Sequence, residues 1–308
     1  MREWVRNVMI RDRWLDFWHA LPPFRGRLAI ARIVAQHLMT NDRNQVAWAT
    51  LPNGFRMKVD LRWHGGYDVL YYFRTYEAAL ASLLIRAVDE DGAVLIDVGA
   101  NIGVFCFLAA GVLRRRGGQA LAIEPLAQNL EFLTASIEAN RLHDVIVPLA
   151  VAVGDRDGVL SLAPLESGTI ANARPVSWSG PEVRGTSSNI VVPMKTLDAI
   201  VSERGLGRVT FLKIDIEGAE LFALRGAENL LKTQRPLVYA EFHREYTQSN
   251  GTTESDIAAF ADSVNYRVEY LSRDGEVTST PPSLDSRMLD IVLVPRDLSP
   301  QQRRVLKR

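Results

Sequence analysis

The chain has 308 residues, of which 47% are hydrophobic and 23% charged, and its 36 Lys and Arg residues balance its 36 Asp and Glu residues. This composition is that of a globular protein with one large domain, or with a large domain and a small one. A chain with no net charge has no global field that attracts nucleic acid, so we expect no nucleic-acid partner.

One cysteine, Cys106, is present, so the chain cannot form an internal disulfide, which fits a reducing compartment. We expect Cys106 to pack in the core rather than act as a nucleophile. No apolar run reaches the ~20 residues of a membrane span, and no signal-peptide pattern opens the chain. We therefore expect a soluble, cytoplasmic protein.

Residues 1–85 do not follow a strand–helix repeat and form an expected N-terminal helical and hairpin extension. Residues 1–40 have helical spacing, are rich in aromatic side chains and are interrupted at Pro22-Pro23. Arginines outnumber acids here, so one interpretation is an interfacial helix that contacts a membrane surface. We favour the other, a helical cap that packs on the main domain or on a second copy in a homo-oligomer. The turn residues 52–54 predict a hairpin between strands at 46–50 and 55–61.

Residues 86–296 alternate between strand and helix patterns, and 297–308 form a basic tail that we expect to be solvated. Predicted strands lie at 93–96, 119–123, 145–153, 209–214, 236–240, 267–271 and 288–294. Predicted helices include 76–88, 104–112, 126–140, 219–231 and 255–264, the last with Ser255 as its N-cap. The pattern predicts an α/β fold with a doubly wound, mostly parallel sheet of about seven strands. Residues 167–188, rich in Gly, Ser and Pro, predict a long loop of the kind that covers a site.

The first distinctive stretch, residues 93–103, joins a buried strand to a helix through a glycine turn. Asp97 ends the strand, and Gly99, Asn101 and Gly103 follow at alternate positions. Such turns bring backbone N–H groups to a ligand, and a carboxylate at the strand end suits a ligand with a cationic or hydroxylated part. S-adenosylmethionine has both, an ammonium group and a ribose. The alternative is a tight turn in which glycine serves geometry only.

Other polar residues follow the predicted strands at the same edge of the sheet. Glu124, after the second strand, is placed to accept hydrogen bonds from a ribose diol, or else to pair with a helix dipole. Asp215 and Glu217 end the fourth strand and could deprotonate a hydroxyl or hold a divalent ion; the alternative is an ion pair of Asp215 with Lys213.

Glu241 and His243 share one face at the end of the fifth strand. His243 could act as a general base, and Asp215, Glu241 and His243 together are candidate metal ligands. A hydrogen-bonded structural histidine is an equal alternative. Because these groups end neighbouring strands of one predicted sheet, we expect Asp97, Glu124 and Asp215 to share one crevice.

Several of these stretches together resemble the FkbM family of S-adenosylmethionine-dependent methyltransferases. The matching pieces are Tyr76-Glu77 and residues 96–103, 122–125, 196–198, 212–220 and 241–243. The spelling KIDIEGAE combined with DVGANIG makes the resemblance specific, and it spans roughly residues 70–245. One departure is Thr75, where we expect a glycine before Tyr76-Glu77, and it weakens the inference for Glu77 alone.

The resemblance implies the class I, Rossmann-like methyltransferase fold and methyl transfer to oxygen, commonly on a sugar or a polyketide-like small molecule. It places the cofactor around Glu77, Asp97, Gly99, Asn101, Gly103 and Glu124. Asp215, Glu217 and His243 are then candidate bases for the acceptor hydroxyl, with or without a divalent metal.

Two rival functions come from other classes. A nicotinamide-dependent oxidoreductase would show a three-glycine fingerprint, which this chain lacks. A catalytically silent scaffold of the same fold would act through the aromatic N-terminal helices instead.

Overall fold

The structure is a computed structural model that describes residues 46–61, 70–71, 74–164, 173–175, 189–281 and 287–307. The predicted helices of residues 1–40 and most of the predicted loop at 167–188 lie outside these ranges. The chain divides into two compact units, Met1–Tyr76 and Glu77–Arg308. The second unit therefore begins earlier than the expected domain limit of residue 86, because the helix that precedes the first core strand belongs to it.

In the first unit, the predicted hairpin is confirmed. Strands β1 (Val46–Thr50) and β2 (Arg56–Asp60) pair antiparallel. Gly54, in the turn, has φ 87°, a left-handed conformation that glycine adopts without steric cost. One face of the hairpin carries the buried side chains of Ala47, Ala49, Met57 and Val59.

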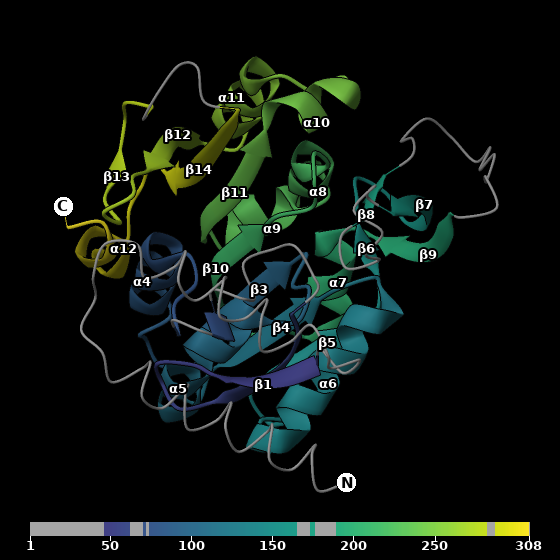
Figure 1. Cartoon of the computed structure of the whole chain (residues 1–308). Coiled ribbons are helices and arrows are strands. Elements are labelled where there is room, and N and C mark those ends of the chain that lie inside the picture. The colour runs from purple at the N-terminus through teal and green to yellow at the C-terminus, as the bar shows by residue number, and fades with distance from the viewer. Residues whose placement is uncertain are drawn as a thin grey trace, which may run out of the picture. The chain divides into compact units, whose positions relative to one another are not determined.

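The second unit is built on an eight-stranded sheet with the order β13-β12-β14-β11-β10-β3-β4-β5 (Figure 1). The strands are β3 (Val94–Val98), β4 (Gln119–Ile123), β5 (Ile146–Leu149), β10 (Val209–Ile214), β11 (Leu237–His243), β12 (Tyr266–Leu271), β13 (Val277–Thr278) and β14 (Met288–Pro295). From β5 to β11 neighbouring strands are parallel, whereas β14 runs antiparallel to both β11 and β12. The doubly wound, mostly parallel sheet is confirmed, with the two-residue β13 as an added edge strand.

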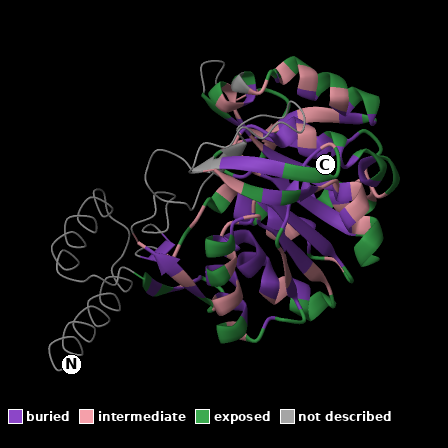
Figure 2. Cartoon of the chain, turned by 90° about the vertical axis from the view of Figure 1, so that its right-hand side faces the viewer, coloured by how far each residue is buried: buried purple, intermediate pink, exposed green. Residues whose placement is uncertain are grey.

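Helices cover both faces of this sheet, and its central strands are buried, as Figure 2 shows in purple. The helices are α4 (Ala78–Ala87), α5 (Val104–Arg116), α6 (Ala127–Asn140), α7 (Leu197–Arg204), α8 (Glu220–Arg225), α9 (Glu228–Thr233), α10 (Arg244–Ser249), α11 (Glu254–Ser263) and α12 (Pro300–Val305). One core cluster joins apolar side chains of the strands to those of α7, α8, α9 and α11. On the sheet's other side, α4 and α5 pack on each other and contact β3, β4 and β10.

The expected third strand, residues 145–153, is split between two sheets. β5 remains in the main sheet, whereas β6 (Ala152–Val153) pairs parallel with β9 (Ile190–Lys195) in a second, four-stranded sheet. That sheet also contains β7 (Gly158–Pro164) and the short β8 (Ala173–Pro175), which falls inside the range predicted to be loop. Its buried face forms a separate apolar cluster that includes Leu160, Val192 and Met194.

The single helix predicted for residues 219–231 is wrong, because the structure has two helices, α8 and α9, separated at Gly226-Ala227. A Cβ on Gly226 would lie 2.0 Å from the Gly154 carbonyl oxygen, so the chain approaches this backbone too closely for any other residue. The new helix start is capped from a distance: Asp198 accepts hydrogen bonds from the backbone N–H groups of Asn229 (2.9 Å) and Leu230 (2.8 Å).

The predicted N-cap of the next helix is also wrong. Thr253, not Ser255, caps α11: its side chain accepts from the Asp256 N–H while the Asp256 carboxylate accepts from the Thr253 N–H. This reciprocal capping box satisfies two backbone N–H donors. Ser255 lies inside the first turn of α11 and is therefore not its N-cap.

The expected solvated tail is a further correction. Residues 300–305 form α12, which has its own capping box between Ser299 and Gln302. Val305 and Leu306 are buried, and α12 contacts α4. Burial of these apolar side chains fixes the C-terminal segment on the second unit.

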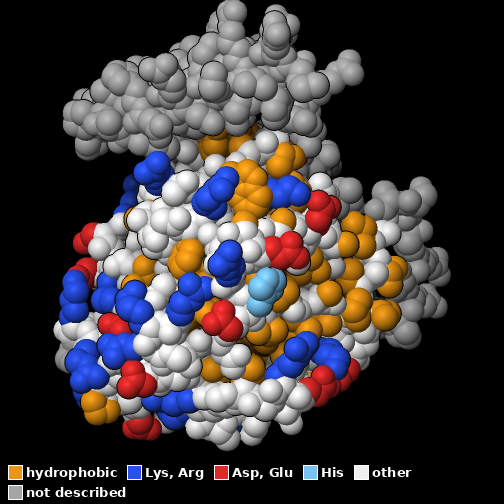
Figure 3. Space-filling model, turned by 90° about the horizontal axis from the view of Figure 1, so that it is seen from below, with side chains coloured by type: hydrophobic (Ala, Val, Ile, Leu, Met, Phe, Trp, Pro, Cys, Tyr) orange, Lys and Arg blue, Asp and Glu red, His pale blue; other side chains and the backbone are white. Residues whose placement is uncertain are grey.

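Within the ranges the structure describes, no helix combines the length and the apolar character needed to cross a membrane. Figure 3 shows basic and acidic side chains interspersed on one face of the molecule, as the equal numbers of the two kinds suggest.

Candidate active site

The glycine turn after β3 depends on left-handed backbone at three alternate residues. Gly99, Asn101 and Gly103 have φ values of 73°, 52° and 87°. A Cβ on Gly99 would lie 1.9 Å from the Asp215 carbonyl oxygen, and one on Gly103 would lie 2.5 Å from Leu133 Cδ1. The glycines therefore let the ends of β3 and β10 meet and seat α5 against α6.

A buried ion-pair network lies beneath this turn. Lys213 Nζ lies 3.2 Å from Asp97 Oδ1 and 3.2 Å from Asp215 Oδ2, and it donates to the Gly99 carbonyl oxygen at 3.4 Å. The Lys213 side chain is 2% exposed and that of Asp97 is fully buried. Burial opposes the positive charge, but Asp215 and Asp97 outweigh it and hold the pKa of Lys213 above its usual value. Lys213 is therefore a fixed cation that joins the carboxylates of two neighbouring strands.

Cys106 is fully buried in α5, as expected for a core residue. Its thiol donates to Asp97 Oδ2 at 3.5 Å. Burial and the neighbouring Asp97 carboxylate both raise the pKa of the thiol, which keeps it protonated. Cys106 thus supports Asp97 rather than acting as a nucleophile.

Glu124 joins two strand ends through backbone hydrogen bonds. Its Oε2 accepts from the Asn101 N–H at 2.9 Å, and its Oε1 accepts from the Leu126 N–H at 2.9 Å. Burial raises the pKa of Glu124 to about 7, although these backbone donors act in the opposite direction. The carboxyl group therefore fixes the glycine turn to the start of α6, at the edge where we expected a ribose ligand.

The segment after β10 is a tight turn that Glu220 holds from inside. Glu217 and Gly218 have φ values of 56° and 98°. Glu220 Oε1 accepts from the N–H groups of Ile216 (3.2 Å) and Gly218 (3.0 Å). A Cβ on Gly218 would lie 2.7 Å from the Tyr246 backbone. This turn directs residues 215–217 to the strand end, and strained backbone of this kind is concentrated at functional sites.

Glu241, at the end of β11, lies among other acidic side chains at this edge of the sheet. Burial and the charges of Asp215, Glu77 and Glu217 together raise the pKa of Glu241 to about 9, while Lys213 opposes them. Glu241 is therefore protonated at neutral pH, although its carboxyl group lies among other acids.

Tyr239 and Asp290 extend the same face of the sheet. Tyr239 lies two residues before Glu241 in β11 and is register-paired with Lys213, while Asp290 is paired with Glu241. The Tyr239 hydroxyl donates to Asp290 Oδ1 at 2.5 Å. Strand alternation thus places a continuous row of polar side chains across β3, β10, β11 and β14.

Glu77 reaches this edge from the start of α4. It is the helix N-cap, it has a left-handed φ of 37°, and its charge raises the pKa values of both Glu241 and Tyr239. The departure at Thr75 therefore does not prevent Glu77 from facing the end of β11.

His243 ends β11 and stacks on Tyr246, with ring centroids 3.9 Å apart and planes at 15°. Its Nδ1 is buried and has no hydrogen-bond partner within the described part of the chain. Across those same residues, no group of three or more His, Cys, Asp or Glu side chains is arranged to hold a metal ion, and this includes the predicted set Asp215, Glu241 and His243.

The structure thus brings the predicted carboxylates to one edge. Asp97 and Asp215 share Lys213, Glu124 binds Asn101 of the glycine turn, and Glu241 is influenced by Asp215 and Glu217. Sequence reasoning missed Glu220, Tyr239 and Asp290. The position of Tyr239, two residues before Glu241 in a strand, could have indicated its face, but nothing in the sequence indicates that Asp290 is its partner.

Comparison with known proteins gives a consistent result. The family model described as "Methyltransferase FkbM domain" matches residues 97–268. The chain is 25% identical over 167 residues to hexuronic acid methyltransferase AglP of Haloferax volcanii, a match over 54% of this chain and 62% of the relative. It is 29% identical over 175 residues to 31-O-demethyl-FK506 methyltransferase FkbM of Streptomyces tacrolimicus, over 49% of this chain and 66% of the relative. The chain therefore spans slightly less than two thirds of the length of each relative.

A crystal structure of methyltransferase FkbM from Methylobacillus flagellatus KT shares 18% sequence identity with the chain. The match covers 67% of this chain and 43% of the other, with a TM-score of 0.43.

Proposed function

The chain belongs to the FkbM methyltransferase family, and from this premise we propose that it transfers a methyl group from S-adenosylmethionine to a hydroxyl oxygen of a small polyhydroxylated acceptor. The class I methyltransferase fold expected from the sequence agrees with the observed strand order and its antiparallel β14. The two relatives, a hexuronic acid methyltransferase and a 31-O-demethyl-FK506 methyltransferase, support a sugar, a glycan or a polyketide-like molecule as acceptor.

The charge balance of the site carries this proposal. Lys213 is the cation that bridges Asp97 and Asp215, so two carboxylates share one cation. These three side chains therefore carry one more negative than positive charge. A ligand with a sulfonium and an ammonium group would balance the excess, whereas a dinucleotide pyrophosphate would add negative charge.

The residues that would hold the cofactor lie in the glycine turn and at the ends of the neighbouring strands. The turn at Gly99, Asn101 and Gly103 brings backbone close to the strand ends, as a nucleoside ligand requires. Asp97 and Glu77 supply negative charge to the amino acid part of the cofactor. Glu124 remains the candidate for the ribose hydroxyls, because a carboxyl oxygen that accepts one backbone hydrogen bond can accept another.

When bound, S-adenosylmethionine supplies a methyl group on a sulfonium that is already a good leaving group. The chain must then align the acceptor hydroxyl and remove its proton. Asp215, Glu217 and His243 remain the candidate proton acceptors. Glu241 is suited to a different role: because its pKa is about 9, at neutral pH it can donate a hydrogen bond to an acceptor oxygen.

Calorimetry with S-adenosylmethionine and with NAD tests the cofactor assignment. We expect S-adenosylmethionine to bind with an affinity of roughly micromolar order, a free energy of about −8 kcal/mol, and NAD not to bind. Asp97→Asn should weaken this binding, and the matched control Asp89→Asn, at an exposed position beyond α4, should not. NAD uptake without S-adenosylmethionine uptake would contradict the proposal and favour the oxidoreductase.

Mass spectrometry of labelled methyl transfer into an extract of the source organism tests the acceptor. An added methyl mass on a sugar or polyketide product, lost with Asp97→Asn, is the expected result. If the Asp97→Asn chain retains its biological role without binding the cofactor, the silent scaffold is favoured instead. To identify the proton acceptor, kcat is measured at saturating cofactor for the single variants Asp215→Asn, Glu217→Gln and His243→Gln. The proton acceptor is the residue whose replacement lowers kcat across the pH range.

The contact of residues 1–40 with a membrane stays a separate proposal. Flotation of the full chain with anionic liposomes, compared with a chain that lacks these residues, tests it. Equal flotation of the two would contradict the membrane contact.

A further inference from the structure

A pocket lies at the amino ends of strands β10 and β11, whereas the carboxylates lie at their carboxyl ends. It has a volume of about 380 Å³, within the range of small-molecule sites. The residues that line it are Arg208, Thr233, Gln234, Arg235, Arg296, Asp297, Leu298, Ser299, Gln302 and Arg303. They precede β10 and β11 or follow the antiparallel β14, so they gather where the two parallel strands begin.

The lining of this pocket contains four arginines and one acid. Arg208 pairs with Glu90 at 3.3 Å and Arg296 with Asp262 at 2.5 Å, but each guanidinium side chain is still about half exposed, at 53% and 50%. Such exposed pairs are weak and leave donors available to a ligand. Arg303 is exposed and forms no ion pair with any residue that the structure describes.

Arg235 supplies the strongest observation. Its Nη2 donates to the Asn265 carbonyl oxygen at 3.0 Å and its guanidinium lies 5.4 Å from the Tyr266 ring centroid, so its side chain is held in place. Asp297 Oδ2 is 4.0 Å away on a side chain that is 84% exposed. The Arg235 Nε is buried and has no hydrogen-bond partner within the described ranges. The side chain as a whole is 24% exposed and lines the pocket, so the accessible part of this fixed guanidinium is what a ligand would meet.

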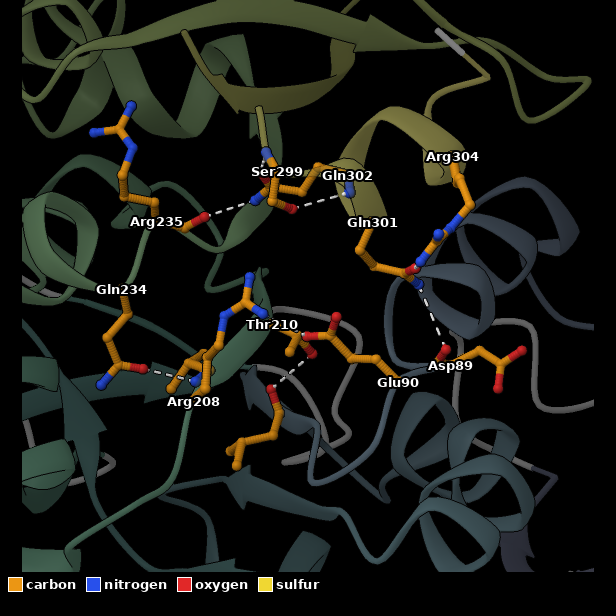
Figure 4. A network of polar contacts seen from close by, with 12 residues as sticks. Asp89, Glu90, Arg208, Thr210, Gln234, Arg235, Ser299, Gln301, Gln302 and Arg304 are labelled. Atoms are coloured by element: carbon orange, nitrogen blue, oxygen red, sulfur yellow. Dashed lines mark hydrogen bonds and ion pairs between the residues drawn. The ribbon is translucent and has the colours of Figure 1, made fainter. Parts of the chain in front are cut away.

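The residues that line the pocket around Arg235 are held in place by hydrogen bonds within the protein. The Arg235 backbone has a left-handed φ of 55°, and its carbonyl oxygen accepts from Gln302 Nε2 at 2.7 Å. Gln302 Oε1 in turn accepts from the Ser299 N–H, and Gln234 Oε1 accepts from the Val209 N–H at 2.7 Å. Figure 4 shows these hydrogen bonds, with Arg208 beside Gln234 and Arg235 beside Gln302. A site with fixed walls loses little entropy when a ligand binds.

We propose that this pocket binds a phosphorylated small molecule at a site separate from that of methyl transfer. Guanidinium groups present several N–H donors in a planar fork that matches the oxygens of phosphate, and three or four of them favour a group with more than one negative charge. The pocket volume leaves room for a body attached to the phosphate.

Binding at this pocket would stabilise the start of the two strands that carry the catalytic edge. β10 runs from Val209 to the turn at Asp215, and β11 runs from Leu237 to His243. A ligand that binds the folded chain alone raises its unfolding temperature, and the effect grows with the logarithm of the ligand concentration once this exceeds Kd.

Calorimetric titration of the full chain with pyrophosphate and with inorganic phosphate, at constant ionic strength, tests the proposal. Wild-type protein should bind pyrophosphate more tightly than phosphate. Arg303→Ala and Arg235→Gln should each weaken pyrophosphate binding by about tenfold or more, since each loses charge-assisted hydrogen bonds. Arg304→Ala is the matched control: this neighbour on α12 donates to Gln301 Oε1 and does not line the pocket.

The outcomes separate this site from the methyl-transfer site and from misfolding. S-adenosylmethionine affinity and unfolding temperature without pyrophosphate should be the same for Arg303→Ala, Arg304→Ala and wild type. If wild type does not bind pyrophosphate, or if Arg304→Ala weakens binding as much as Arg303→Ala, the pocket is not a phosphate site. The proposal is then overturned without any effect on the cofactor assignment.

Discussion

The Lys213 ammonium lies 3.2 Å from the Asp97 carboxylate, and both side chains are buried in the centre of the sheet. Lys213→Met removes the cation and leaves two acids unpaired, so we expect a loss of about 3–5 kcal/mol in the free energy of unfolding. The double variant Lys213→Met/Asp97→Asn should be more stable than Lys213→Met, because it removes one of the unpaired charges. Urea unfolding of the single and double variants measures this coupling, and additive effects would contradict it.

Gly99→Ala should unfold the chain or prevent its expression as a soluble protein. The new Cβ would lie 1.9 Å from the Asp215 carbonyl oxygen, a distance that only a shift of β3 or β10 relieves. Gly117→Ala is the matched control, because Gly117 has a similar left-handed φ of 63° with open space around it. It should cost only about 1 kcal/mol, the price of the backbone conformation alone. Circular dichroism and thermal unfolding compare the stability of the two variants. Equal losses of stability would show that backbone strain, and not the close contact with Asp215, destabilises Gly99→Ala.

Thr253→Ala should destabilise the chain by about 1 kcal/mol, because α11 loses a capping box that satisfies two backbone donors. Ser255→Ala lies two residues later inside the helix and should change stability by less than about 0.5 kcal/mol. Chemical unfolding of the two variants compares the observed cap with the one predicted from the sequence. A larger effect at Ser255 would contradict the capping assignment.

Glu241→Gln should make the chain more stable than wild type at alkaline pH. Burial and neighbouring carboxylates raise the pKa of Glu241 from its ordinary 4.5 to about 9, so the folded protein favours the protonated form. That contribution is complete below about pH 4.5 and is lost as the pH rises toward 9, where unfolding releases the cost of the buried charge. Glutamine cannot ionise, so the difference in unfolding temperature should grow across this range.

Glu228→Gln provides the control for this pH series. Glu228 is exposed in α9 and pairs with Lys232 at the surface, so its replacement should shift the curve little at any pH. A Glu241→Gln curve parallel to wild type would show that Glu241 ionises freely in the folded chain.

The sheet was predictable because its strands are marked by apolar runs that end in polar residues. β4 and β10 have the predicted bounds, and the hairpin turn at Asn53-Gly54 is where its sequence indicates. The convergence of Asp97, Glu124 and Asp215 was predictable too, since parallel strands present their carboxyl ends at one edge.

The predictions that were wrong share a physical cause, because each of the observed features depends on a contact with a distant part of the chain. The break between α8 and α9 requires the Gly154 backbone and the carboxylate of Asp198, which lie far away in sequence. The burial of Val305 depends on a surface made by other elements, which composition does not reveal. Local patterns show where an element starts, but not which remote group satisfies its backbone.

The second sheet begins and ends beside the same point of the chain. β6 pairs with β9 in register, and the Gly154 N–H donates to the Lys195 carbonyl oxygen at 3.1 Å, so the chain leaves and returns at adjacent points. Residues 155–194 therefore form a segment whose two ends lie side by side, so exchanging it for the corresponding piece of another family member should leave the main sheet intact.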